Sequence, residues 1–387
     1  MLPEMNVSDA IRYVGINDHD ITLFEAQFDL ERGMAYNSFV ILDEKIAVTD
    51  GVDAACVEQW LANVAAVLGD RKPSYFIVHH MEPDHSAGIE AFMAAYPEAT
   101  IVSSAAAFRM MKQFFGTDYA DRQLAVKEGS VLELGAHRLT FVTAPMVHWP
   151  EVVMSFESTE GVLFSADAFG KFGANDIEDP EGWACEARRY YFGIVGKYGP
   201  QVQAVLKKAA ALPVKTICPL HGPVLTDTIP EVLATYNTWS SYQPEDEGVT
   251  IVCACVYGHT LEAARLLQED LTARGVKAKV HDIVHDDWAE AVEDAFRYDR
   301  LVLAASTYNM DVFPAMRTFI HHLTLRGYKN RKVAFIENGS WAPAAAKVMK
   351  SLFEGSSLTF AETGVTVKSA LDAASTAAVK KLAEELA

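Results

Sequence analysis

The chain has 387 residues, half of them hydrophobic, and a formal net charge of −19 at pH 7. This length favours two domains, and the acidity argues against a nucleic-acid partner, which requires a basic surface. There is no apolar run of about eighteen residues and no basic amphipathic stretch, so we expect no membrane partner. The N-terminus lacks a signal-peptide pattern, which predicts a cytoplasmic protein. The five cysteines are scattered and form no C-x-x-C pair, which favours reduced thiols and excludes a tetracysteine iron site within this chain.

The first two thirds of the chain alternate between strand-rich blocks and helices. We expect strands over 21–28, 36–42, 46–49, 75–78, 100–102, 139–142, 152–156, 162–166 and 216–219, and helices over 53–67, 91–96, 105–115 and 183–212. This alternation predicts two sheets covered by helices on both sides, an αββα arrangement.

A polar, charged linker over 243–248 gives the best domain boundary, which predicts domains of residues 1–247 and 248–387. The second domain repeats strand and helix regularly. We expect strands over 249–254, 276–280, 301–305, 333–336 and 358–367, and helices over 260–274, 288–296, 315–325, 342–353 and 370–386. Such repetition predicts a doubly wound parallel sheet.

Potential metal ligands gather directly after the apolar strand that ends at residue 78. His80, Glu82 and Asp84 alternate along the chain, and His85 follows. Pro83 argues against a helix here, and in an extended chain side chains two residues apart point the same way, about 6.6 Å from each other. This spacing suits ligands around one metal ion or two adjacent ones.

Three further ligand-type residues follow other apolar strands, namely His148, Asp167 and His221. Each of them alone is explained as an ordinary hydrogen-bonded or surface residue. Ligand-type residues at four successive strand ends are harder to explain by chance, because such ends meet at one edge of a sheet. The sequence therefore predicts a metal site at this edge.

The pattern His-x-Glu-x-Asp-His, followed by His148, Asp167 and His221, resembles the metallo-β-lactamase superfamily. Glu82, where the hydrolases of that superfamily have His, is typical of the flavodiiron proteins. Other family-like stretches are Ala35–Phe39, His148–Glu151 and Glu186–Tyr191. The resemblance covers essentially the whole chain, and it implies an N-terminal metallo-β-lactamase-like di-iron domain followed by a flavodoxin-like domain.

The resemblance also implies the ligand set. One iron ion would be bound by His80, Glu82 and His148, the other by Asp84, His85 and His221, with Asp167 bridging them. Whether His85 coordinates is left open, because family members differ in this. His79 lies outside the pattern and is expected to support a ligand or to belong to the core, and Tyr190 and Tyr191 either lie near the pocket or are core aromatics.

Three loops of the second domain predict a flavin site. The first joins a strand to a helix and can hold a phosphate through backbone N–H groups, and the other two add polar groups and aromatic walls. These loops contain Cys255, Val256, Tyr257, Gly258, His259, Thr260, Ser306, Thr307, Tyr308, Asn309, Asn338, Gly339, Ser340 and Trp341. The domain resembles flavodoxin, which implies FMN as the cofactor.

The first loop departs from the usual flavodoxin pattern. Cys255 stands where a hydroxyl residue is usual and His259 where Asn is usual, and Ser306 replaces a Pro of the middle loop. Because a thiol is a weaker donor than a hydroxyl, FMN affinity lower than the family norm is expected. A dinucleotide fingerprint is missing from these loops, so direct oxidation of NAD(P)H is not supported.

The function implied by the resemblance is reduction of O2 to water, of NO to N2O, or of both, through FMN and two iron ions. The chain carries no rubredoxin or reductase module, so we expect a separate electron donor, either rubredoxin-like or a flavin reductase. The family implies a head-to-tail homodimer or a dimer of dimers. Two alternatives remain, a zinc hydrolase fused to a flavodoxin-like module and an electron-carrier flavoprotein. The preference between O2 and NO is not decided by spacing.

Overall fold

The structure is a computed structural model that describes residues 5–387. It divides into two compact units, one of residues 1–191 and 200–237 and the other of residues 192–199 and 238–387. The predicted boundary between residues 247 and 248 stays a prediction. The predicted linker is ordered in part, since a strand already begins at Asp246. Within residues 5–387, no helix combines the length and the hydropathy of a membrane span.

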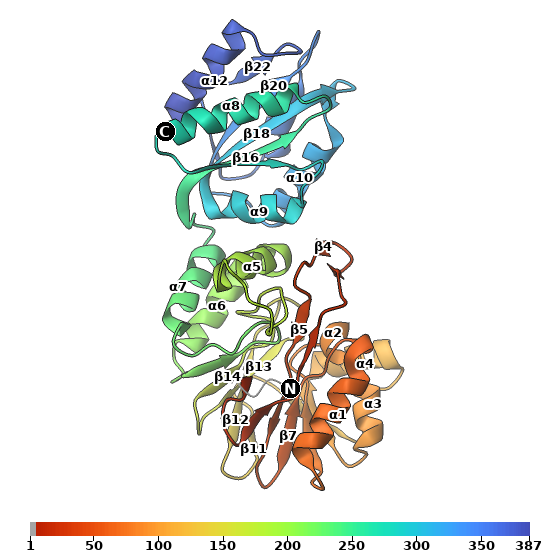
Figure 1. Ribbon diagram of the computed structural model, residues 1–387. Helices are drawn as coiled ribbons and strands as arrows, with labels where there is room; N and C mark the ends of the chain where they lie inside the picture. The colour runs from red at the N-terminus through yellow and green to blue at the C-terminus, as the bar shows by residue number, and fades with distance from the viewer. Residues whose placement is uncertain (1–4) are drawn as a thin grey trace. The chain divides into compact units, whose positions relative to one another are not determined.

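The first unit contains two central sheets with helices outside them (Figure 1). The first sheet has the order β1 (Ile11–Tyr13), β6 (Phe39–Ile41), β7 (Ile46–Thr49), β8 (Pro73–Ile77), β9 (Thr100–Ser104) and β10 (Gln123–Val126). The second has the order β11 (Val131–Glu133), β12 (Arg138–Thr143), β13 (Val153–Glu157), β14 (Val162–Phe164) and β15 (Thr216–Cys218). Two small ribbons pair β2 (Ile16–Asp18) with β5 (Met34–Tyr36) and β3 (Leu23–Phe24) with β4 (Phe28–Asp29).

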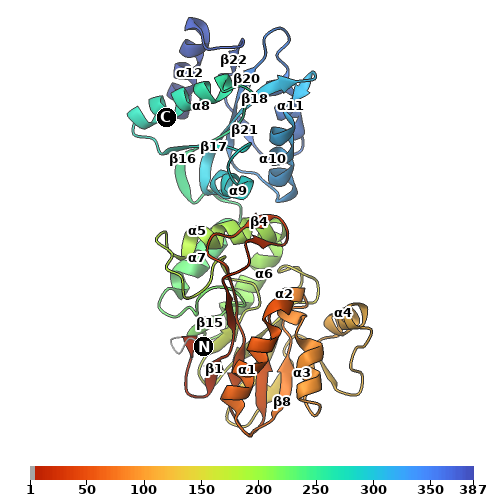
Figure 2. The ribbon, with the colours of Figure 1, turned by 45° about the vertical axis from the view of Figure 1, so that its right-hand side comes forward.

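Helices cover the outer faces of both sheets, as Figures 1 and 2 show. The helices of this part of the chain are α1 (Val57–Leu68), α2 (Pro83–Ser86), α3 (Ile89–Ala95), α4 (Ala105–Phe115), α5 (Trp183–Tyr190), α6 (Gly199–Ala209) and α7 (Ile229–Ser240). Between the sheets lies one apolar core, in which the Phe39 and Phe164 rings meet with their centres 5.7 Å apart. The predicted αββα arrangement is confirmed.

The second unit is built on one parallel sheet in the order β17, β16, β18, β20 and β21, with β22 also beside β20 and β19 antiparallel to β18. Its strands are β16 (Asp246–Ala254), β17 (Ala278–Asp282), β18 (Tyr298–Tyr308), β19 (Asp311–Val312), β20 (Lys332–Asn338), β21 (Thr359–Phe360) and β22 (Val365–Val367). This order is the 2-1-3-4-5 order of one doubly wound fold, so the predicted sheet is confirmed.

Five helices cover this sheet, namely α8 (His259–Ala273), α9 (Trp288–Arg297), α10 (Pro314–Leu325), α11 (Ala345–Leu352) and α12 (Ala373–Leu386). Helices α8 and α12 pack on one face, where Leu267 and Leu382 join the core beneath them. The other three lie on the opposite face (Figures 1 and 2). In such a sheet, ligands bind outside the carboxyl ends of the strands.

Several local predictions need correction. The expected strand over 21–28 is the hairpin of β3 and β4, and the expected strand over 36–42 is divided between β5 and β6. The helix expected from residue 53 begins as a 3-10 turn, which Asp53 caps by accepting a hydrogen bond from the Ala55 N–H at 2.9 Å. Helix α7 and the edge strand β10 were not predicted.

Candidate functional site

The predicted ligands of the first unit come together at one edge of its paired sheets. His80 follows β8, His148 lies in the connection from β12 to β13, Asp167 follows β14, and His221 follows β15. The prediction that Pro83 excludes a helix is wrong, because α2 begins at Pro83. Proline is tolerated in the first turn of a helix, where its missing N–H would have no intrahelical partner. Glu82 is therefore the residue before α2, and Asp84 and His85 lie on that helix.

Two groups of side chains in the cluster have the composition of metal sites. His80, Glu82, His148 and Asp167 form one group, and Asp84, His85 and His221 form the other, each with ligand atoms within 4.8 Å of one another. In the first group, the Nε2 atom of His148 lies 3.0 Å from both Glu82 Oε2 and Asp167 Oδ2. The Nε2 atom of His80 lies 3.2 Å from Glu82 Oε2 and 3.3 Å from Asp167 Oδ2.

In the second group, the Nε2 atoms of His85 and His221 lie 3.1 Å apart, and each is 3.3 to 3.4 Å from Asp84 Oδ2. Asp167 connects the two groups. Its Oδ1 atom lies 3.2 Å from His85 Nε2, whereas its Oδ2 atom faces the first group. One carboxylate thus presents one oxygen to each group.

The donor set fits positive ions. Both carboxylate oxygens of Asp84 and of Asp167 are buried and make no hydrogen bond of adequate geometry with residues 5–387. His221 donates Nδ1–H to the Ala35 carbonyl at 2.8 Å, and His80 directs Nδ1 at the Glu151 carboxylate at 2.8 Å. With Nδ1 protonated, a neutral imidazole has its lone pair on Nε2, which points into the cluster.

The close contacts between imidazoles and carboxylates shift the pKa values of the residues in the cluster. Burial opposes the charged form of His80, but Asp167 and Glu151 outweigh burial and raise its pKa well above the usual value. Burial also opposes ionisation of Asp167, yet the neighbouring imidazoles hold its pKa well below the usual range. Likewise, the carboxylates beside His148 raise its pKa to about 9 against the effect of burial. The carboxylates therefore retain negative charge that protons or metal ions must balance.

Several supporting residues were not predicted by number. Glu151 accepts hydrogen bonds from both His80 Nδ1 and the Met81 N–H, at 2.8 and 2.9 Å, and so fixes the orientation of the His80 ring. Asn37 donates to the carbonyls of Pro219 and Gly222 and so holds the loop that carries His221. Both residues fall within the family-like stretches, which was the available signal.

His79 does not join the ligand groups. It contacts Asp50 Oδ2 at 2.5 Å and Ser155 Oγ at 2.8 Å and is buried, so among the two expected roles these contacts fit that of a core residue. The ring of Tyr190 lies 5.5 Å from that of His221, and burial together with nearby carboxylates raises the pKa of Tyr190 well above its usual value. Tyr191 packs on Tyr236 instead.

Two aromatic rings from the N-terminal part of the chain also lie beside His221 of the second ligand group. The Phe24 and Tyr36 rings lie 5.7 and 5.9 Å from the His221 ring. The hairpin of β3 and β4 thus contributes an apolar wall beside His221. Residue spacing does not predict these contacts, because they depend on the path of the chain between distant segments.

In the second unit, the predicted flavin-site residues lie at the carboxyl ends of β16, β18 and β20. The hydroxyl oxygen of Thr260, at the start of α8, lies 3.1 Å from Ser306 Oγ. Tyr257 and Trp341 are 90% and 89% exposed, so both rings are available to a ligand. Gly258 has a φ of 95°, which permits the tight turn before α8. In the same loop Val256 is exposed, and His259 Nδ1 lies 3.1 Å from Glu262 Oε2.

The other two loops differ from prediction in their bounds. Strand β18 extends to pair with β19 and includes Ser306, Thr307 and Tyr308. Of the predicted residues of this loop, only Asn309 lies in the turn between the two strands. The Thr307 hydroxyl accepts from the Ala344 and Ala345 N–H groups.

Asn338, the last residue of β20, exchanges two hydrogen bonds with the Ser369 backbone. Ser340 Oγ is 2.7 Å from Ser369 Oγ, and the Gly339 N–H donates to Val367 O. These bonds fix the third loop against the segment that follows β22.

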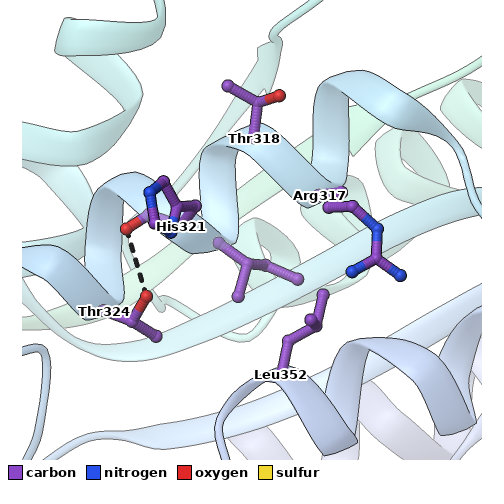
Figure 3. A pocket seen from close by; sticks show the side chains of 6 residues that line it. Arg317, Thr318, His321, Thr324 and Leu352 are labelled. Carbon is purple, nitrogen blue, oxygen red and sulfur yellow. Dashed lines mark hydrogen bonds between the residues drawn. The ribbon is translucent and has the colours of Figure 1, made fainter.

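A separate cavity of about 380 Å³ lies along α10 (Figure 3). Its lining consists of Arg317, Thr318, Ile320, His321, Thr324 and Leu352. The Arg317 guanidinium is paired with Asp311 at 2.5 and 2.7 Å, and Thr324 donates to the His321 carbonyl. None of the predicted site residues lines this cavity.

The chain is similar in sequence and in fold to several known proteins. Residues 34–222 match the model of the ODP family beta lactamases. The chain is 29% identical to a diflavin flavoprotein of Nostoc sp. over 95% of this chain and 64% of that protein, so it spans less than two thirds of that relative. It is 26% identical to a nitric oxide reductase of Moorella thermoacetica over 94% of this chain and 92% of that one.

Two solved structures have the same fold. One is the rubredoxin oxygen:oxidoreductase of Desulfovibrio gigas, with a TM-score of 0.91 at 24% identity, covering 98% of this chain and 97% of that one. The other is the flavodiiron protein of Giardia intestinalis, with a TM-score of 0.91 at 23% identity, covering 100% and 97%. The likeness covers both units.

Proposed function

Since this chain belongs to the flavodiiron proteins, we propose that it is an oxidoreductase that reduces O2 to water, NO to N2O, or both. The observation that carries the proposal is the pair of adjacent ligand groups joined by Asp167. A mixed set of imidazoles and carboxylates suits iron, which changes its oxidation state and needs charge compensation. The relatives named for oxygen and nitric oxide support the choice of diatomic substrates.

The ligand assignment follows from the two groups. His80, Glu82 and His148 would hold one iron ion, Asp84, His85 and His221 the other, and Asp167 would bridge them. The buried oxygens of Asp84 and Asp167 support this assignment, since they accept no hydrogen bond from residues 5–387 and a cation would compensate their burial. Glu151 would keep the His80 lone pair directed at the metal.

We assign FMN to the loops that follow β16, β18 and β20. The N-terminus of α8 would hold the phosphate, and the exposed rings of Tyr257 and Trp341 would flank the flat ring system. When bound, FMN and the iron pair would supply the electrons of the reaction. The chain's own residues would position these groups, and the Phe24 and Tyr36 rings beside His221 would help to exclude water from the site.

The proposed partners follow from the family. We propose that electrons come from a separate protein, rubredoxin-like or a flavin reductase, and that the protein acts in the cytoplasm. We further propose a head-to-tail homodimer or a dimer of dimers as the working assembly. Sedimentation of the full chain measures this directly, and a monomer at working concentration would contradict it.

Two measurements test the function. Elemental analysis of the full chain should give about two iron ions per chain, as a closely spaced two-metal site requires. Two zinc ions together with esterase activity would defeat the proposal in favour of a hydrolase. Rapid mixing of the reduced protein with O2 or NO should then give reoxidation far faster than that of free FMN. Reoxidation no faster than free flavin would leave only an electron carrier, and comparing the two gases gives the preferred substrate.

A further inference from the structure

Two cysteines lie together where β16 meets α8. Cys253 is buried in the core of the second unit, and Cys255, two residues later, packs partly buried against the same core. Because both side chains pack against the same core cluster, they lie on the same face of the extended chain. In extended chain the Cα atoms of such a pair are about 6.6 Å apart, which is within the range that a disulfide spans.

The surroundings of Cys255 favour its thiolate. Its Sγ atom accepts the Gly258 N–H at 3.0 Å, just before the first turn of the 15-residue helix α8. A hydrogen bond from Cys253 and others from the Thr260 and Leu261 backbone lower the pKa of Cys255 to about 4. The shared hydrogen bond and burial raise the pKa of Cys253. The pair therefore resembles a reactive thiol beside a resolving thiol.

The same donors would be needed by a phosphate. The N–H groups of Gly258 and of the first turn of α8 are those that the first loop offers to an anion. In the structure they converge on the sulfur of Cys255. A phosphate bound at this loop must take these donors from the thiolate.

We propose that Cys255 and Cys253 form a reversible redox pair that hydrogen peroxide oxidises, and that bound FMN protects. The part that concerns FMN rests on the proposed function, whereas the thiol chemistry does not. The Cys255 thiolate attacks one peroxide oxygen, the O–O bond breaks, and hydroxide leaves, so that a sulfenic acid forms. The Cys253 thiol then attacks that sulfur, the S–O bond breaks, and water leaves with formation of the disulfide. Overall two thiols lose two electrons and peroxide becomes two waters.

The test treats the full-length protein with peroxide, with and without excess FMN, and follows the peptide Thr216–Arg265 by mass spectrometry. This tryptic peptide contains Cys218, Cys253 and Cys255. We expect a loss of about two mass units, located between Cys253 and Cys255 and reversed by dithiothreitol. Excess FMN should slow this loss at least about tenfold, because it withdraws the donors that stabilise the thiolate.

Matched controls come from the same chain. Cys56 is also partly buried, but burial and nearby carboxylates raise its pKa to about 12, so it should react more than about tenfold slower than Cys255. Cys253→Ser should stop the reaction at a sulfenic acid on Cys255, which dimedone captures, and Cys255→Ser should abolish the mass loss. Cys218→Ala should leave the mass loss intact.

The outcomes separate this inference from the proposed function. Oxidation of Cys56 as fast as Cys255, or a wild-type protein that accumulates sulfenic acid without a disulfide, overturns the redox pair. Quenching of FMN fluorescence reports that FMN binds. If bound FMN does not slow the oxidation of Cys255, the proposed competition between phosphate and thiolate is overturned. Failure of FMN to bind at all defeats the proposed cofactor, while disulfide formation in its absence still supports the thiol pair.

Discussion

The Nε2 atoms of His85 and His221 lie 3.1 Å apart, with Asp84 Oδ2 within 3.4 Å of both. The His221 ring donates its Nδ1–H to the Ala35 carbonyl, so the lone pair of its Nε2 atom faces His85. The His85 ring then either donates its Nε2–H to His221 or joins His221 beside a cation. This relationship supports the proposal that His85 belongs to the second ligand group.

We predict that His85 binds metal in this chain. His85→Ala should leave the first group intact and remove the second metal ion, because only Asp84 and His221 would remain beside the shared Asp167. Elemental analysis should fall from about two to about one metal ion per chain. Retention of both ions in the variant would assign His85 a role in packing alone.

Glu82 should be essential to the first group. Its carboxylate lies 3.0 Å from His148 and 3.2 Å from His80, and both imidazoles lower its pKa despite burial. Glu82→Ala should therefore lose iron from this group and lower turnover with either gas by at least about 100-fold. Glu58→Ala, an exposed position on α1, serves as the control and should change neither quantity.

Glu151 should act through His80. Removal of a carboxylate that orients a ligand typically costs about 10–100-fold in metal affinity, and Glu151→Ala should show a loss of this size in a metal-competition titration. Glu151→Gln retains an oxygen for the His80 and Met81 N–H groups and should lose less. Equal losses in the two variants would mean that charge, and not orientation, is the contribution of Glu151.

His322 should make stability depend on pH in the second unit. Its ring stacks on Trp288 at 3.9 Å, and burial with the neighbouring Arg326 lowers its pKa from 6.5 to about 4. Protons therefore bind the unfolded chain more strongly, so the contribution is complete above about pH 6.5 and declines as the pH falls towards 4.

The effect is measured by urea unfolding of the wild type and of His322→Gln at pH 7.5 and pH 5. The wild type should lose on the order of 1 kcal/mol more than the variant between these values, a figure discounted for the partial exposure of the ring. The metal cluster titrates equally in both proteins, so the difference isolates His322. Parallel curves would contradict the prediction.

Trp341 should contribute to flavin binding. The ring is 89% exposed in the protein without ligand, so stacking on a flavin would cost no internal contact. Trp341→Ala should weaken FMN binding by about 1 kcal/mol or more, roughly a fivefold to tenfold rise in Kd. Flavin fluorescence titration measures this, with Phe114→Ala, an exposed aromatic of the first unit, as the unchanged control.

Prediction from sequence succeeded where local chemistry determines the outcome. Residues 46–49 and 105–115 were predicted as a strand and a helix with the bounds that the structure gives to β7 and α4, because their apolar periodicity is strong. The helix α7 was missed because Pro230 and several β-branched and aromatic residues weaken its signal. β18 extends through Tyr308 because its end pairs with β19, which periodicity does not report.

Some residues of the candidate site could be predicted from the sequence, and others could not. Ligand-type residues were found because metal binding requires particular side chains at strand ends. The roles of Glu151 and Phe24 depend on contacts between segments distant in sequence, at 71 and 197 residues' separation from the imidazoles that they touch. No local pattern encodes such contacts. The short helix at Pro83 shows that a single residue preference can also mislead, since proline is tolerated at a helix start.

The position of His221 beyond β15 has a consequence for biosynthesis. The cluster draws on side chains from residue 80 to residue 221, so a growing polypeptide on the ribosome lacks one ligand until this last strand has emerged. Under the proposed ligand assignment, metal uptake at both positions follows completion of the first unit, and nascent chains arrested before His221 should retain at most a partial complement of metal.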